Sequence, residues 1–215
     1  MNDLVFLESA KMDAEPFTTS DIIAECAGVQ HHTITRLIRK HMKDFEEFGV
    51  CGFEIHKPLI GSKGGHPEKI YHLNEQQATL LITYLQNTPQ VRAFKKELVR
   101  QFYVMRTELT RRQAEREALK PIRRSLTDAV KEAGGKPWAY KNYTDLAYKS
   151  ATGQTAAQLR KTRAAPKTAK AVEYMTSDEI HAVAKRQNQI TTLLELGLDY
   201  QDVKALLEGK SSPQE

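Results

Sequence analysis

A run of hydrogen-bonding side chains between residues 30 and 40 has the chemistry needed to read the edges of DNA bases. Arg pairs bidentately with guanine, Gln pairs with adenine, and a Thr methyl group contacts the methyl group of thymine. The sequence therefore predicts base contacts from one group of neighbouring residues: Gln30, His31, His32, Thr33, Thr35 and Arg36. Two cations further along, Arg39 and Lys40, suit phosphates, which position a protein on DNA without specifying sequence.

Residues 17–41 are expected to form two short helices joined by a tight turn, with the polar side chains on the second helix. Thr18 is expected to cap the first helix. Gly28 lies where the chain must turn, and glycine reaches positive φ without steric cost. A small residue, a turn glycine and buried aliphatic residues match the helix-turn-helix pattern: Ala24, Gly28, Val29, Ile34 and Leu37. An αα-hairpin with a solvated polar face remains the alternative, because the motif is short.

Two short strands are expected next, over residues 51–57 and 69–73, with a glycine-rich loop between them. A helix pair followed by a hairpin is the order of a winged helix-turn-helix. The wing would lie along the DNA backbone, with contacts from three lysines: Lys57, Lys63 and Lys69. The alternative is an ordinary surface hairpin whose lysines only keep the loop soluble.

Two further helices complete the first half of the chain. Asn74 is expected to cap a helix over residues 75–86, and a long helix is expected over residues 89–119. The long helix has an apolar stripe made of Val91, Phe94, Leu98, Phe102 and Met105. Beyond residue 109 the stripe ends, so we expect a domain boundary near residues 110–120. Such a helix is also a plausible seam for a homodimer.

Residues 17–110 resemble the phage regulatory protein Rha family. The resemblance depends on the order of these elements, on a strand-to-helix step in Tyr71–Leu85 and on an amphipathic helix over Phe94–Phe102. It implies that the N-terminal domain is a DNA-binding regulatory module of temperate phages and prophages. Family members often carry a Gly-Lys pair before the final helix, where this chain has Thr88, Pro89 and Gln90. At this point the chain departs from the family pattern and lacks the lysine that the resemblance would imply.

The second half of the chain contains helical patterns and no convincing strand. It resembles the helical C-terminal domains attached to phage antirepressor-type proteins. We therefore expect a mainly α protein with a small β-hairpin, an α+β fold of two domains. The expected divisions are a winged helix-turn-helix domain, a helical linker, an all-α domain and a tail, over residues 1–110, 111–120, 121–210 and 211–215 respectively.

The net charge of +5 is unevenly distributed along the chain. Residues 111–170 hold 15 Lys and Arg against 5 Asp and Glu, an excess of 10 positive charges. A second basic patch is predicted at Arg160, Lys161, Arg163 and Lys167. Further cations of this segment that could bind phosphates are Lys170, Arg111, Arg112, Arg116, Lys120, Arg123 and Arg124.

The basic segment also contains the aromatic residues Trp138, Tyr140 and Tyr143. These side chains could stack on the bases of single-stranded nucleic acid. We favour a packed aromatic core, because large aromatic residues are usually buried.

Several classes of site find no support in the sequence. Cys26 and Cys51 are too few for a disulfide framework and are expected to be buried, reduced thiols. There is no CxxC or HxxxH pair for zinc and no nucleotide-binding or hydrolase motif, so we expect no metal, no cofactor and no enzymatic activity. Without a signal peptide or transmembrane run, the protein is expected in the cytoplasm of a bacterial host cell.

The sequence therefore predicts a phage or prophage transcriptional regulator that binds double-stranded DNA, with homodimerisation as an option. The alternative is an antirepressor or adaptor that binds a phage repressor or another regulatory protein. This alternative is favoured by the charge of residues 1–110, which hold 13 Lys and Arg against 14 Asp and Glu. Strong DNA binders usually carry a basic face.

Overall fold

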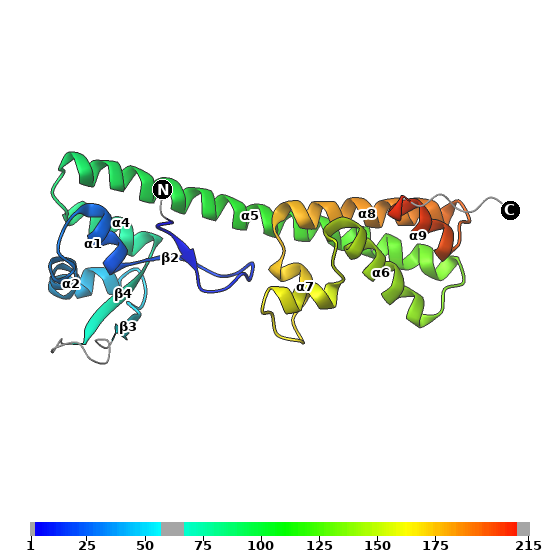
Figure 1. Ribbon diagram of the computed structural model, residues 1–215, viewed down its shortest axis with the longest axis horizontal. Coiled ribbons are helices and arrows are strands. Elements are labelled where there is room, and N and C mark those ends of the chain that lie inside the picture. The colour runs from blue at the N-terminus through cyan, green and yellow to red at the C-terminus, as the bar shows by residue number, and fades with distance from the viewer. Residues whose placement is uncertain (1–2, 57–66, 210–215) are drawn as a thin grey trace. The chain divides into compact units, whose positions relative to one another are not determined.

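The computed structural model describes residues 3–56 and 67–209. Figure 1 shows a mainly helical chain with a small antiparallel sheet, which confirms the predicted fold class. The chain forms two compact units. Unit 1 comprises Met1–Ser9 and Ala14–Thr107, and unit 2 comprises Ala10–Asp13 and Glu108–Glu215.

The sheet of unit 1 has four antiparallel strands in the order β1-β2-β4-β3. The strands are β1 (Phe6–Leu7), β2 (Pro16–Thr19), β3 (Phe53–His56) and β4 (Glu68–Asn74). The predicted hairpin corresponds to β3 and β4, with Phe53 opposite Tyr71.

Strand β2 corrects the prediction for Thr18. We expected this residue to cap the first helix, but it lies in β2 opposite Leu73, with its side chain fully buried. The N-cap is Thr19, whose side chain makes no capping hydrogen bond. Pairing with β4 satisfies the backbone hydrogen-bonding groups of this segment, and β-branched threonines suit a strand. The strand therefore continues up to the residue before the helix.

Helices accompany this sheet in the part of unit 1 that the structure describes. They are α1 (Ser20–Ala27), α2 (His31–Lys40), α3 (Met42–Glu46), α4 (Glu75–Tyr84) and α5 (Pro89–Glu132). The predicted turn glycine, Gly28, ends α1 with φ of 67°. The side chain of the predicted cap, Asn74, accepts a hydrogen bond from the Gln77 N–H, and the Gln77 side-chain oxygen accepts one from the Asn74 N–H. The local sequence predicted both the turn glycine and the helix cap.

The apolar stripe of α5 packs into the core of unit 1. Val91, Phe94, Leu98 and Phe102 are all buried there, together with Ile34 and Ile38 of α2. This stripe is therefore covered within unit 1, and homodimerisation through the long helix stays a prediction. The apolar side chains that α5 leaves exposed in unit 1 include Val99, Tyr103 and Val104.

Helix α5 also extends beyond residue 119, where the sequence predicted that the long helix ends. The structure has one helix from Pro89 to Glu132, with Pro121 inside it. An interior proline lacks an N–H donor and costs about 3 kcal/mol. Leu119, Leu126 and Val130 are buried on either side of it. Burial of these side chains stabilises the continuous helix against the local cost of the proline.

Unit 2 is built from the C-terminal part of α5 and the elements that follow. These are α6 (Pro137–Thr152), α7 (Ala156–Thr162), the 3₁₀ turn η1 (Ala171–Tyr174), α8 (Ser177–Glu195) and α9 (Tyr200–Glu208). The described residues of unit 2 contain no strand. Two apolar clusters form its interior, one around Met175 and Ile180 and the other around Ile190 and Val203.

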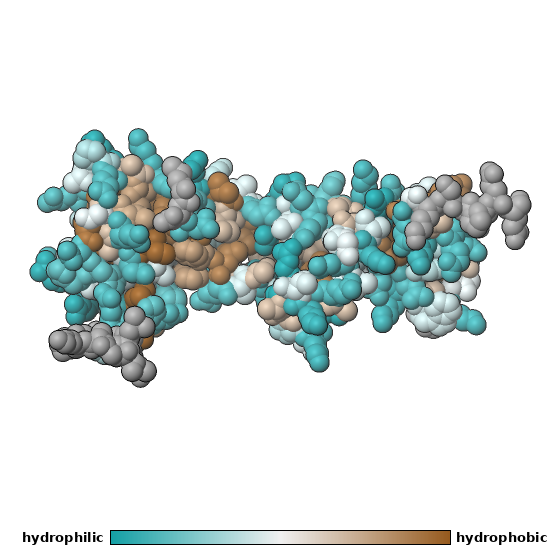
Figure 2. Space-filling view, in the orientation of Figure 1, coloured by the Kyte–Doolittle hydropathy of each residue, from teal (hydrophilic) through white to brown (hydrophobic). Residues whose placement is uncertain are grey.

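The surfaces of the two units differ in character. In Figure 2 the visible face of unit 1 carries more hydrophobic surface than that of unit 2, which is mainly hydrophilic. Over residues 3–56 and 67–209, no helix combines the length and apolarity that a membrane span requires.

Candidate nucleic-acid interface

Helix α2 separates buried aliphatic residues from exposed polar ones. Ile34 and Ile38 are fully buried. His32, Arg36 and Lys40 recur every four residues and are exposed, so they lie along one line of the helix surface. Gln30 and Arg39 are exposed as well, and Thr33 and Thr35 are partly exposed. The packing therefore leaves most of the predicted contact residues accessible.

Hydrogen bonds within α2 restrict what two of these side chains can offer. The Thr35 hydroxyl donates to the His32 carbonyl at 3.1 Å, which leaves its oxygen as an acceptor and its methyl group as an apolar contact. The Arg39 Nε donates to the Thr35 carbonyl at 3.3 Å, which leaves the terminal guanidinium nitrogens as donors. Arg36 forms no ion pair or side-chain hydrogen bond within the described part of the chain.

His31 has a different environment from the other predicted contact residues. Its Nε2 lies 2.8 Å from the Ser20 hydroxyl of α1, and its Nδ1 lies 2.5 Å from a carboxylate oxygen of Glu68 in β4. The Ser20 oxygen also accepts the Tyr71 N–H at 2.9 Å. Only 14% of the His31 side chain is exposed. His31 therefore connects both helices of the pair to the sheet.

The hydrogen bonds that run from the serine through the histidine to the glutamate form a relay. Its order is that of a serine–histidine–carboxylate triad. A nucleophilic serine must reach a substrate, but Ser20 is fully buried and its oxygen already accepts the Tyr71 N–H. The geometry therefore favours a structural relay. Sequence reasoning missed Ser20 and Glu68, because 11 and 37 residues separate them from His31 and no local pattern connects them.

The β3–β4 pair carries both cationic and carboxylate side chains. The Lys69 ammonium lies 3.4 Å from the centroid of the Phe53 ring, which fixes this exposed cation on the strand pair. Glu54 lies within 3.3 Å of His56 and of His72, so carboxylates are also present. The predicted backbone contacts Lys57 and Lys63 lie outside the described residues.

The predicted second basic patch in unit 2 is divided by its ion pairs. Arg163 contacts Glu179 at 2.7 Å, whereas Arg160 lines a pocket, and Lys161 and Lys167 are exposed. Four further cations of this segment are paired with carboxylates, through the contacts Arg111–Asp178, Arg112–Glu108, Arg116–Glu173 and Lys120–Glu117. Four of these five carboxylates lie outside residues 111–170, so they offset part of the charge excess counted in that segment.

The two cysteines are free thiols, and both are partly exposed where we expected buried ones. Partial burial raises the pKa of both the Cys26 and the Cys51 thiol, which keeps them protonated and weakly nucleophilic. Among the residues that the structure describes, no group of three His, Cys, Asp or Glu side chains could hold a metal ion.

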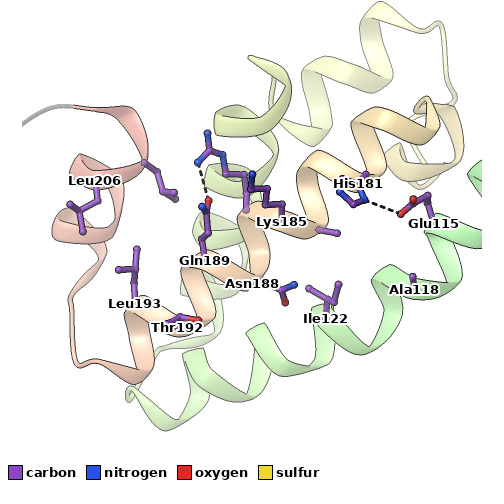
Figure 3. A pocket seen from close by; sticks show the side chains of 13 residues that line it. Glu115, Ala118, Ile122, His181, Lys185, Asn188, Gln189, Thr192, Leu193 and Leu206 are labelled. Carbon is purple, nitrogen blue, oxygen red and sulfur yellow. Dashed lines mark hydrogen bonds and ion pairs between the residues drawn. The ribbon is translucent and has the colours of Figure 1, made fainter.

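Unit 2 also contains an apolar groove of about 940 Å³. Figure 3 shows Ala118 and Ile122 of α5 on one side, with Leu193 of α8 and Leu206 of α9 on the other. Polar side chains border it, among them His181, which approaches Glu115 at 3.5 Å. A groove of this composition suits an amphipathic helix from a partner protein.

Comparison with known proteins identifies the N-terminal unit. Residues 18–107 match the family model of phage regulatory protein Rha, and comparison with curated proteins gave no match. The matched range begins in β2 and ends in α5, and it includes the helix pair, β3, β4 and α4. The resemblance predicted from the sequence is therefore confirmed. Residues 18–107 of unit 1 are therefore similar to the phage regulatory protein Rha family.

Proposed function

We propose that the protein is a DNA-binding transcriptional regulator of the phage or prophage type. One observation carries the proposal: α2 buries Ile34 and Ile38 and exposes a line of polar and cationic side chains whose chemistry suits contacts with bases and phosphates. In this proposal α1 and α2 form the helix-turn-helix, and β3 with β4 forms the wing. The protein acts without enzymatic chemistry, in the cytoplasm of the host bacterium.

Helix α2 enters the major groove of duplex DNA. The residues that face the bases are Gln30, His32, Thr33, Thr35 and Arg36. His31 acts as a positioning residue, because its ring nitrogens face Ser20 and Glu68. Arg39, Lys40 and Lys69 contact the DNA backbone. The same role is assigned to Lys57 and Lys63 from the sequence alone.

Sequence selection from randomised duplex DNA tests the proposal, with the full chain at low and near-physiological salt. An enriched motif is expected. Arg36→Ala should then weaken binding by about 1–3 kcal/mol and relax preference at one position, because a bidentate contact to one base is lost. Arg39→Ala should weaken binding to all sequences alike and lower the salt slope by about 1.

The matched control is Arg92→Ala. Arg92 is an exposed arginine of unit 1 that lies on α5 rather than on α2, and its loss removes the same charge. It should leave the selected motif unchanged. Equal losses from Arg36→Ala and Arg92→Ala would show that binding depends only on net charge and would contradict base reading by α2.

The second candidate function is that of an antirepressor or adaptor that binds a repressor or another regulatory protein. The apolar groove between α5, α8 and α9 favours it, because a protein partner could bury Leu193 and Leu206. This candidate predicts no DNA retention by the full chain, even at low salt. That result would remove the DNA-regulator proposal and leave a protein partner as the leading function.

A further inference from the structure

A second concave site in unit 2 brings together three cations from three different helices. Arg123 comes from α5, Lys141 from α6 and Arg160 from α7. They line a pocket of about 660 Å³, together with Tyr140 and Asp145. Asp145 offsets one of the three positive charges, which leaves an excess of two. This pocket is separate from α2 and its predicted DNA contacts, which lie in unit 1.

These cations differ from most other arginines of the basic segment because they lack carboxylate partners. Within the described part of the chain, none of Arg123, Lys141 and Arg160 forms an ion pair. Burial raises the pKa of the Tyr148 hydroxyl, and the cations of Arg123 and Arg160 partly offset that rise. Both guanidinium groups therefore lower the pKa of the same buried hydroxyl. Such unpaired, converging cations are suited to an anionic ligand.

An exposed aromatic ring lies on α6, the helix that contributes Lys141 to the pocket. Trp138 is 64% exposed, which contradicts our expectation that it packs in a core. It precedes Lys141 by three residues, and residues three apart are neighbours on a helix surface. Tyr143, by contrast, is buried as expected. Large exposed aromatic rings beside cations are the usual means of binding bases and phosphates together.

We propose that this pocket binds the backbone phosphates of single-stranded nucleic acid, with a base stacked on Trp138. Arg123, Lys141 and Arg160 supply the phosphate donors. Stacking on an aromatic face requires an unpaired base, because bases in a duplex already stack on each other. The proposal therefore assigns unit 2 a ligand different from the duplex DNA proposed for unit 1, and it does not depend on that function.

Trp138 is the single tryptophan of the chain, so its intrinsic fluorescence reports on this site. The test is titration of the full chain with an oligothymidylate of about 15 nucleotides at low salt. Saturable quenching is expected. Trp138→Ala, followed with a labelled oligonucleotide, should weaken binding about 5-fold to 150-fold. Arg123→Ala, Lys141→Ala and Arg160→Ala should each weaken it and lower the salt slope by about 0.7.

Arg124→Ala is the matched control. Arg124 is the exposed neighbour of Arg123 on α5 and does not line the pocket, so its loss should leave affinity nearly unchanged. Arg36→Ala, in unit 1, should likewise leave quenching intact, which separates this site from the duplex contact of α2. Circular dichroism melting of each variant distinguishes lost binding from lost folding.

Three results would overturn the proposal. The first is absence of quenching by the oligothymidylate at low salt. The second is quenching that Arg123→Ala, Lys141→Ala and Arg160→Ala reduce no more than Arg124→Ala does. The third is equal affinity for the oligothymidylate, inorganic phosphate and a matched duplex, because a site that stacks unpaired bases must prefer the single strand.

Discussion

The turn between α1 and α2 depends on the backbone conformation of Gly28. Its φ of 67° lies in the left-handed region, and a Cβ there would lie 2.6 Å from the Gln90 side-chain amide. Gly28→Ala should lower the free energy of unfolding of unit 1 by about 1–2 kcal/mol, because alanine is strained at positive φ. Urea unfolding followed by circular dichroism measures this change.

Gly28→Asn is the matched variant, because asparagine tolerates left-handed conformations better than alanine does. It should cost less stability than Gly28→Ala, although its side chain is larger. If Gly28→Asn lowered the free energy of unfolding more than Gly28→Ala does, contact with Gln90 rather than backbone strain would explain why glycine occupies this position.

A pH dependence is expected from Glu108 in unit 2. Burial raises the pKa of this carboxyl, but hydrogen bonds from Ser177 and Arg112 outweigh burial and hold the pKa below its usual value. A carboxyl with a depressed folded pKa stabilises the fold above its unfolded pKa. Its contribution should therefore be present above about pH 4.3 and disappear as the pH falls through the folded pKa.

Glu108→Gln tests this linkage in thermal melts across the acid range. The variant should be less stable than the wild type at neutral pH, and the difference should shrink in acid as the wild-type carboxyl becomes protonated. Glu132→Gln, an exposed change on the same helix, should show no such convergence. A constant difference between Glu108→Gln and the wild type at all pH values would contradict the assignment.

At the scale of elements, α5 shows that packing outweighs a local breaker. Pro121 lies inside a helix whose neighbouring apolar residues Leu119 and Leu126 are buried. Pro121→Ala should raise the melting temperature of unit 2, because it restores an N–H donor and removes a steric clash worth up to about 3 kcal/mol. Calorimetry of the full chain measures the shift.

Pro121→Gly provides the comparison. Glycine also restores the N–H donor but costs about 1 kcal/mol more than alanine inside a helix, so it should stabilise less. Destabilisation by both replacements would mean that the proline ring itself contributes to the packing of α5. That result would contradict the explanation that Pro121 carries a cost which packing outweighs.

At the scale of the whole molecule, one short N-terminal segment belongs to unit 2. Residues 10–13 belong to unit 2, although the segments on either side belong to unit 1. Met12 is buried in the unit 2 core, and its N–H donates to the Glu173 carbonyl at 2.8 Å. Met12→Ala should therefore destabilise unit 2, by about 2–5 kcal/mol, despite its distance along the chain.

Calorimetry of the full-length variant measures this effect, with Met42→Ala as the control. Met42 packs partly exposed against the core of unit 1, so its loss should affect the transition of unit 1 instead. If Met12→Ala shifted only the transition that Met42→Ala shifts, residues 10–13 would belong to unit 1 in solution.

The sequence by itself determined the features that depend on local spacing. Gly28 indicated a turn and Asn74 a helix cap, because each effect involves only neighbouring backbone groups. The alternation of residues 51–57 and 69–73 predicted β3 and β4, and the stripe of α5 predicted a packed helix face. The resemblance to the Rha family also came from the order of these elements.

Tertiary structure alone decided which side chains are available for binding. The relay through Ser20, His31 and Glu68 joins residues far apart in the chain, so no local pattern could reveal it. Ion pairs neutralise Arg112 and Arg163 but leave Arg160 in an open pocket, a difference that charge counts cannot show. Burial and ion pairing depend on which elements meet in space, and those contacts arise only when the chain has folded.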